Sequence, residues 1–145
     1  MPTAVTTHPR RDTFRIPKHK RHVPQARAQI RRILKDWALD AELAHDIATV
    51  ATELVTNSVR HCRVALAQVE VTLSIRGCGL LVEVSDPDRE RIPTLPAGVD
   101  EEAAGGRGLL LVAGLASRWG HDLRPFTKCV WAYFLIPEES RCSDY

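Results

Sequence analysis

The spacing of apolar residues changes between residues 62 and 68, and that change constrains the fold more than any other feature. Over residues 26–54 apolar side chains recur every three or four positions, which predicts two helices. Asp40 is suited to cap the second of them, over about residues 41–62. Over Gln68–Asp86 apolar and polar residues alternate on either side of the glycines at Gly77–Gly79, which predicts an antiparallel hairpin.

The remaining segments complete a layered domain. "TFRIP" (Thr13–Pro17) alternates and ends at a proline, as an edge strand does. Residues 87–104 lack periodicity and predict a long loop, which in compact domains is often a functional lid. Gly105–Ala116 reads as a glycine-rich turn that opens a nearly all-apolar, buried helix, and strands follow over about residues 118–124 and 128–136. This order predicts an α+β fold, a two-layer sandwich in which helices cover one face of a mostly antiparallel mixed sheet.

Length and composition are those of one domain. The chain has 145 residues, of which 44% are hydrophobic and 26% charged, enough to bury one core. We expect this domain over residues 13–137, between a flexible basic leader at 1–12 and a flexible tail at 138–145. No apolar run approaches the roughly 20 residues of a membrane span, and the N-terminus lacks a signal-peptide segment, so a cytoplasmic protein without membrane contact is expected. The four cysteines form no CxxC pair, which favours reduced thiols over a zinc site.

The charge is unevenly distributed. Residues 1–35 carry ten Lys or Arg and one Asp, a sum of +9, and residues 36–145 carry ten against seventeen acidic residues, a sum of −7. A basic arm of this kind can bind nucleic acid or an acidic protein, or can be a solvated leader. The basic stretch includes an amphipathic helix and few aromatic residues, which disfavours nucleic acid.

The stretch ELVTNSVRH (Glu53–His61) places polar side chains along one side of the second helix. Four of them fall within roughly one third of its circumference: Glu53, Asn57, Arg60 and His61. Glu53 and Asn57 border the apolar stripe, where a pocket could open. An amide oxygen can bind Mg²⁺, and a carboxylate one turn away can accept a proton or position a water. The strip is equally compatible with a solvated helix face.

Two further features suit parts of a nucleotide. The alternation of "LLVEVSD" directs Asp86 to the same side as the core valines, where an ionised group needs a donor such as the amino group of adenine. Asp86 could equally be a turn or capping residue. "GGRG" precedes the third helix, where glycine N–H groups and Arg107 could approach phosphates, although such a run is often only a turn. Together the three features describe Mg²⁺-ATP.

These segments resemble the conserved boxes of the histidine-kinase-like (GHKL, Bergerat-fold) ATPases, over about residues 13–137. "ELVTNSVRH" is similar to the N box, "VEVSDPD" to the first glycine box and "GGRGLLLV" to the second. The similarity is greatest to the small anti-sigma factor serine/threonine kinases and their stand-alone actinobacterial relatives. "RWG" and "KCVWA" occupy the places expected for that family.

The resemblance implies an ATP-dependent serine/threonine protein kinase with a site assembled from several segments. Glu53 would be the catalytic base and Asn57 the Mg²⁺ ligand. The residues that would contact ATP are Asn57, Arg60, Asp86, Gly105, Gly106, Arg107, Gly108 and Leu109. The implied partners are a STAS-type anti-sigma factor antagonist, an RNA polymerase sigma factor, or both, and the family also allows a homodimer.

The first glycine box departs from the family pattern. The wider superfamily has DxGxG, whereas "DPDRE" puts Asp88 and Glu90 in place of both glycines. This change predicts a stiffer loop with altered surroundings for the nucleotide. A non-catalytic module that senses nucleotide, or that only binds protein, is therefore the alternative function, and nucleic-acid binding through the basic arm is a third.

Overall fold

The computed structural model describes residues 10–90 and 106–137. The elements in chain order are β1 (Arg11–Pro17), the 3-10 helix η1 (Lys20–His22), α1 (Val23–Asp36), α2 (Ala41–His61), β2 (Gln68–Arg76), β3 (Gly79–Asp86), α3 (Gly106–Leu115), β4 (Arg118–Leu123) and β5 (Lys128–Leu135). This order confirms the succession of helices and strands expected from the sequence. Residues 91–104 of the expected long loop lie outside the described part, as do residues 1–9 of the leader, Gly105 and the tail. Strand β1 begins at Arg11, within the expected leader.

Within the described residues, five strands form one sheet in the order β1-β2-β3-β5-β4. All four pairings in this part of the chain are antiparallel, which confirms the expected α+β sandwich with a mostly antiparallel sheet; the described strands include no parallel pair. For β1 and β2, the direction follows from the pair of helices α1 and α2 between them. Two antiparallel helices return the chain to the end of the sheet where β1 stops, so that Pro17 pairs with Gln68 and β2 runs back along β1. The expected edge position of β1 is confirmed.

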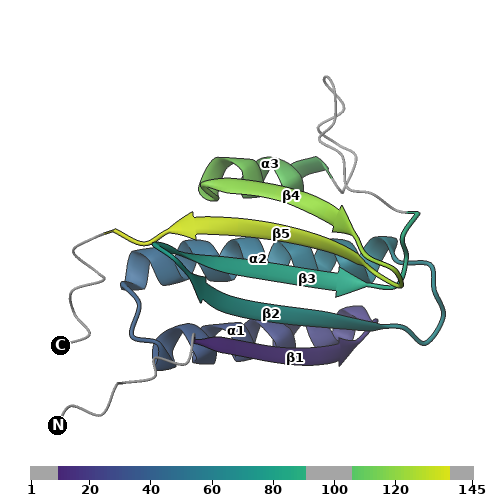
Figure 1. The fold of residues 1–145 in the computed structure, drawn as a ribbon. Coiled ribbons are helices and arrows are strands. Elements are labelled where there is room, and N and C mark those ends of the chain that lie inside the picture. Colours follow the sequence, from purple (N-terminus) through teal and green to yellow (C-terminus); the bar gives the residue numbers. More distant parts are fainter. Residues whose placement is uncertain (1–9, 91–105, 138–145) are drawn as a thin grey trace, which may run out of the picture.

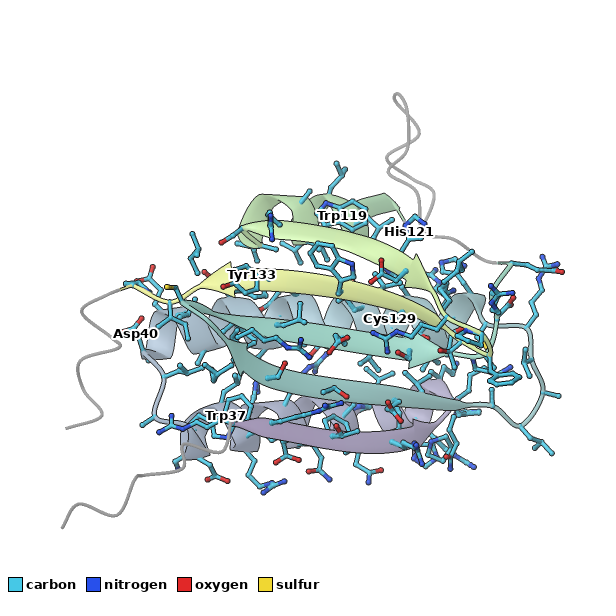
Figure 2. The ribbon with its side chains drawn as sticks, viewed as in Figure 1. Trp37, Asp40, Trp119, His121, Cys129 and Tyr133 are labelled. Carbon is cyan, nitrogen blue, oxygen red and sulfur yellow. The ribbon has the colours of Figure 1, made fainter. Side chains whose placement is uncertain are left out.

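The helices and the sheet form two layers (Figure 1). Helices α1 and α2 lie behind the sheet in this view, and α3 lies at the β4 side, where it packs against α2 and β4. Alternation along β2 directs Val69, Val71 and Leu73 toward the helices, and these three residues are buried in the core. Figure 2 shows the other face of the sheet, on which Cys129 and Tyr133 of β5 lie.

Helix α3 is less buried than its sequence predicts. Leu109 and Val112 are buried, but Leu110 and Leu111 are exposed. The helix begins at Gly106, so most of the GGRG run forms its first turn rather than a turn before it. Because α3 meets α2 and the edge strand β4, only one side of an almost uniformly apolar helix has a neighbour to cover it within the described chain.

Asp40 caps α2, as expected. Its carboxylate accepts a hydrogen bond from the backbone N–H of Leu43 at 3.2 Å. We predict that Asp40→Ala lowers the free energy of unfolding by about 1 kcal/mol, because that N–H loses its acceptor. Urea denaturation measures the effect. Asp36→Ala is the control, since it removes the same charge at the end of α1 without removing a cap. Equal midpoints for the two variants would contradict the prediction.

Candidate functional site

The polar strip of α2 lies at the edge of the core. Glu53 and Asn57 are half-buried, whereas Arg60 and His61 are exposed. The neighbouring stripe of Ile47, Val50, Ala51 and Leu54 is fully covered. The strip therefore borders the core and is not wholly solvated, as the sequence indicated for Glu53 and Asn57.

Glu53 and Arg60 line different cavities. A cavity of about 210 Å³ between α1 and α2 is lined by Glu53 together with Arg27, Arg31, Ala48, Thr49 and Thr52. Glu53 thus shares a solvent-accessible space with two guanidinium groups. Arg60 lines a cavity of about 420 Å³ whose other lining residues are Lys18, His19, Lys20, Val23, Thr56 and Val59. Arg60 therefore lines a cavity together with residues of η1 and of the start of α1.

Asp86 ends β3 as a buried carboxylate with three partners. One oxygen, Oδ2, accepts a short hydrogen bond from the Ser58 hydroxyl and lies 3.5 Å from Nζ of Lys128. The other oxygen, Oδ1, accepts from the backbone N–H of Asp88 at 2.9 Å. Asp86 is 2% exposed and Lys128 3%. Asp86 therefore acts as a turn residue, one of the two roles that the sequence left open, through its bond to the N–H of Asp88. It also forms an ion pair with Lys128 and a hydrogen bond with Ser58 of α2.

Asp88, which stands in place of the first glycine of the box, organises the loop after β3. It is buried, and its Oδ2 accepts from the backbone N–H of Arg63 at 2.8 Å. Its Oδ1 accepts from the backbone N–H of Glu90 at 3.3 Å. This carboxylate ties the start of the loop to the segment after α2, which agrees with the stiffening predicted from DPDRE.

Charges and burial at the end of α2 shift two pKa values. Partial burial lowers the pKa of His61, and the positive charges of Arg60 and Lys128 lower it further. Burial raises the pKa of the Cys62 thiol, and the negative charges of Asp86 and Asp88 act in the same direction. Both residues are thus favoured in their neutral forms beside the Asp86–Lys128 pair. Cys62, Cys78 and Cys129 are free thiols in the described residues.

The glycine box lies on an element that contacts the N-box helix. Gly106, Arg107 and Gly108 form the first turn of α3, and Leu109 is buried. Helix α2 packs against both α3 and β3. The structure therefore brings β3 and α3, the two other elements that carry predicted residues, against α2. Ser58, next to Asn57, makes the direct contact to Asp86.

Sequence reasoning missed Ser58 and Lys128. Ser58 lies within the quoted ELVTNSVRH stretch, on the side of α2 that faces the core. Lys128 begins β5 and pairs with Asp86 across the sheet. The sequence did contain an indication of this role, since Lys128 is the one charged residue in the otherwise apolar run KCVWAYFLI. A charged residue at a core-facing position requires a partner.

The possible metal ligands among the described residues suit a magnesium ion that binds together with a nucleotide. The described residues hold no group of three or more His, Cys, Asp or Glu side chains able to form a protein-only metal site. Mg²⁺ commonly takes one or two protein ligands and completes its shell with phosphate oxygens and water. A single amide at Asn57 fits that arrangement.

The comparison with family models identifies the domain. The model described as "Histidine kinase-like ATPase domain" matches residues 16–134, which is most of the chain. The chain belongs to the histidine kinase-like ATPase family. The resemblance of the chain to this family is thereby confirmed. No curated protein matches the chain.

A solved structure has the same fold. The chain is similar to the crystal structure of the RsbU and RsbW domains of Rv1364c from Mycobacterium tuberculosis, with 14% sequence identity and a TM-score of 0.67. The match covers 88% of this chain and 32% of that one, so the chain spans about a third of its length. At this identity the similarity shows a shared fold and nothing further about function. Separately, no helix of the described residues combines the length and apolarity needed to cross a membrane.

Proposed function

We propose that this histidine kinase-like domain is an ATP-binding regulatory protein of the anti-sigma factor type. It would phosphorylate a serine or threonine of a small STAS-type antagonist and sequester an RNA polymerase sigma factor, in the cytoplasm. The observation that carries the proposal is the packing of α2, on which Glu53 and Asn57 are half-buried, against β3, which ends at Asp86, and α3, which begins at Gly106. The structural similarity to a chain with an RsbW domain supports it.

In this proposal each residue has a separate task. Asp86 accepts a hydrogen bond from the adenine amino group, and Asn57 holds the magnesium ion. The backbone N–H groups in the first turn of α3 lack helical partners and suit phosphate oxygens. Magnesium, when bound, supplies a positive charge that offsets the charge of the phosphates. Arg107 would add positive charge near the same ligand. Arg60 lines the separate cavity beside η1, and its contact with ATP stays a prediction.

Glu53 is the proposed general base. It lies one turn before Asn57 and lines the cavity between α1 and α2, into which the partner's side chain would reach. A carboxylate there can accept the proton of an attacking serine or threonine hydroxyl while the phosphoryl group is held in line. Arg27 and Arg31 line the same cavity and would favour a partner segment of negative charge.

The first test is calorimetric titration of Mg-ATP into the wild type and into Asn57→Ala. We expect the variant to bind at least about tenfold more weakly, because it loses a charge-assisted contact to the ion–nucleotide complex. Thr49→Ala is the control on the same helix, and it should retain wild-type affinity. Folded wild type that binds no ATP at millimolar concentration would refute the nucleotide-binding proposal.

The buried Asp88 supports the alternative, a nucleotide sensor or purely protein-binding module without kinase activity. Its two hydrogen bonds hold the loop that the superfamily leaves flexible with glycine. Phosphate transfer from radiolabelled ATP to the cognate antagonist separates the two functions. Transfer supports the kinase, and ATP binding without transfer to any antagonist supports the sensor.

A further inference from the structure

The cavity beside η1 (the η1 cavity) is separate from the elements that carry the glycine boxes. Its volume is about 420 Å³, within the range of roughly 300–1,000 Å³ that is usual for small-molecule sites. Its lining comes from the η1 segment between Lys18 and Val23 and from the last two turns of α2. None of these lining residues belongs to β3 or α3. The η1 cavity is therefore a second space on the molecule, apart from Asp86 and the GGRG run.

The inner part of the η1 cavity is aliphatic. Val23 and Val59 line it, are half-buried and pack against the core. Thr56 lies between them and α1, and its hydroxyl donates to the carbonyl of Thr52 within α2 at 2.8 Å. The donor of Thr56 is thus already used inside the helix. Walls of this kind favour an aliphatic group on a ligand, because its burial removes apolar surface from water.

The remaining lining residues are basic. Three of them carry a permanent positive charge, and no Asp or Glu is among the lining residues: Lys18, Lys20 and Arg60. Lys20 has no ion-pair partner within the described residues. The fourth polar residue, His19, uses its Nδ1 to accept from the backbone N–H of Arg21 at 3.1 Å. Like charges around one cavity repel each other, so an anion that binds between them is favoured.

The two helix ends beside the η1 cavity also favour an anion. Nζ of Lys18 donates to the carbonyls of Cys62 at 3.1 Å and Val64 at 2.6 Å, which offsets the negative end of α2. Helix α1 begins at Val23, its N-cap His22 makes no side-chain capping bond, and its first turn contains no acid. The positive end of α1 is therefore not compensated by its own residues, and it adds to the charge of Lys20 and Arg60.

We propose that the η1 cavity is a second binding site, which takes an organic anion with an aliphatic body and a phosphate or carboxylate head group. The head group meets Lys20 and Arg60, where the guanidinium can bind it through two N–H groups. The aliphatic body contacts Val23 and Val59. This site does not depend on the proposed function, and it assigns Arg60 to the second ligand in place of ATP.

The test is a titration of the full chain followed by NMR of its backbone amides. The probes are hexyl phosphate and hexanoate, and the ratio of their affinities shows which head group the site prefers. We expect the largest shifts at residues 18–23 and 56–60. Methyl phosphate should bind at least about tenfold more weakly than hexyl phosphate, because each buried methylene group contributes up to about fourfold in affinity. 1-Hexanol, which lacks the charge, should also bind at least about tenfold more weakly.

Lys20→Met tests the basic side of the cavity. We expect it to weaken hexyl phosphate by about threefold or more, because one of the two cations at the head group is lost. Lys20 is exposed, so the substitution leaves the core intact. Arg21→Met is the matched control, since it removes a neighbouring positive charge of η1 that does not line the cavity. Its affinity for hexyl phosphate should match that of the wild type.

Three results would overturn the inference. Equal affinities for methyl and hexyl phosphate would show attraction to a basic surface without use of the aliphatic walls. Equal losses in Lys20→Met and Arg21→Met would show that charge alone attracts the probe to η1. Displacement of hexyl phosphate by Mg-ATP would place the cavity within the nucleotide site, whereas we expect both to bind together. If the wild type binds hexyl phosphate in the η1 cavity but binds no ATP, only the nucleotide-binding proposal falls.

Discussion

Glu53→Gln should lower the rate of phosphoryl transfer to the cognate antagonist by about 10²–10⁴-fold, the usual contribution of a general base. The side chain keeps its size but can no longer accept the hydroxyl proton. Glu53 lines the cavity between α1 and α2. Because no contact of Glu53 with the phosphates or the adenine of ATP is proposed, Mg-ATP affinity should remain close to that of the wild type. Single-turnover transfer from radiolabelled ATP and calorimetry measure the two quantities.

Glu42→Gln is the control for this experiment. It makes the same change of charge on the same helix, in the exposed first turn of α2 and away from the cavity. Its transfer rate should match that of the wild type. A Glu53→Gln protein that retains full transfer would show that the base is another group, whereas loss of ATP binding in the same variant would show that Glu53 contributes to the nucleotide site.

Phe134→Ala should lower the free energy of unfolding by about 3–5 kcal/mol. Phe134 is 2% exposed and is among the largest fully buried side chains of the described core. It lies on β5, where it pairs with Leu80 of β3 and faces the helices. Truncation removes a ring from the layer between sheet and helices and leaves a cavity, and the loss is a large fraction of the roughly 5–15 kcal/mol that stabilises a typical domain.

The matched control for that variant is Phe126→Ala. Phe126 is 85% exposed in the segment between β4 and β5, so its truncation should change stability by no more than about 0.5 kcal/mol. Urea denaturation followed by circular dichroism gives both values. Similar losses for the two variants would mean that the ring of Phe134 does not lie in the core.

The local pattern of apolar and polar residues was sufficient to predict most of the helices and strands. The apolar spacing before residue 62 and the alternation after residue 68 predicted α1, α2, β2 and β3, and the structure places their limits within a few residues. The pattern also predicted that Glu53 and Asn57 border the core. Such features depend on which residues share a face of one helix or strand, and this is determined within a few positions along the chain.

The sequence by itself therefore determined the order of the elements, the cap at Asp40 and the residues that each element presents to the core. Only the tertiary structure decided which other residues they contact. The contact of Asp86 with Ser58 and Lys128 depends on the register of β3 against β5 and on the packing of α2 across their ends. The all-antiparallel sheet and the exposed side of α3 likewise follow from which elements become neighbours. Such pairings join residues far apart in the chain, so no local periodicity encodes them.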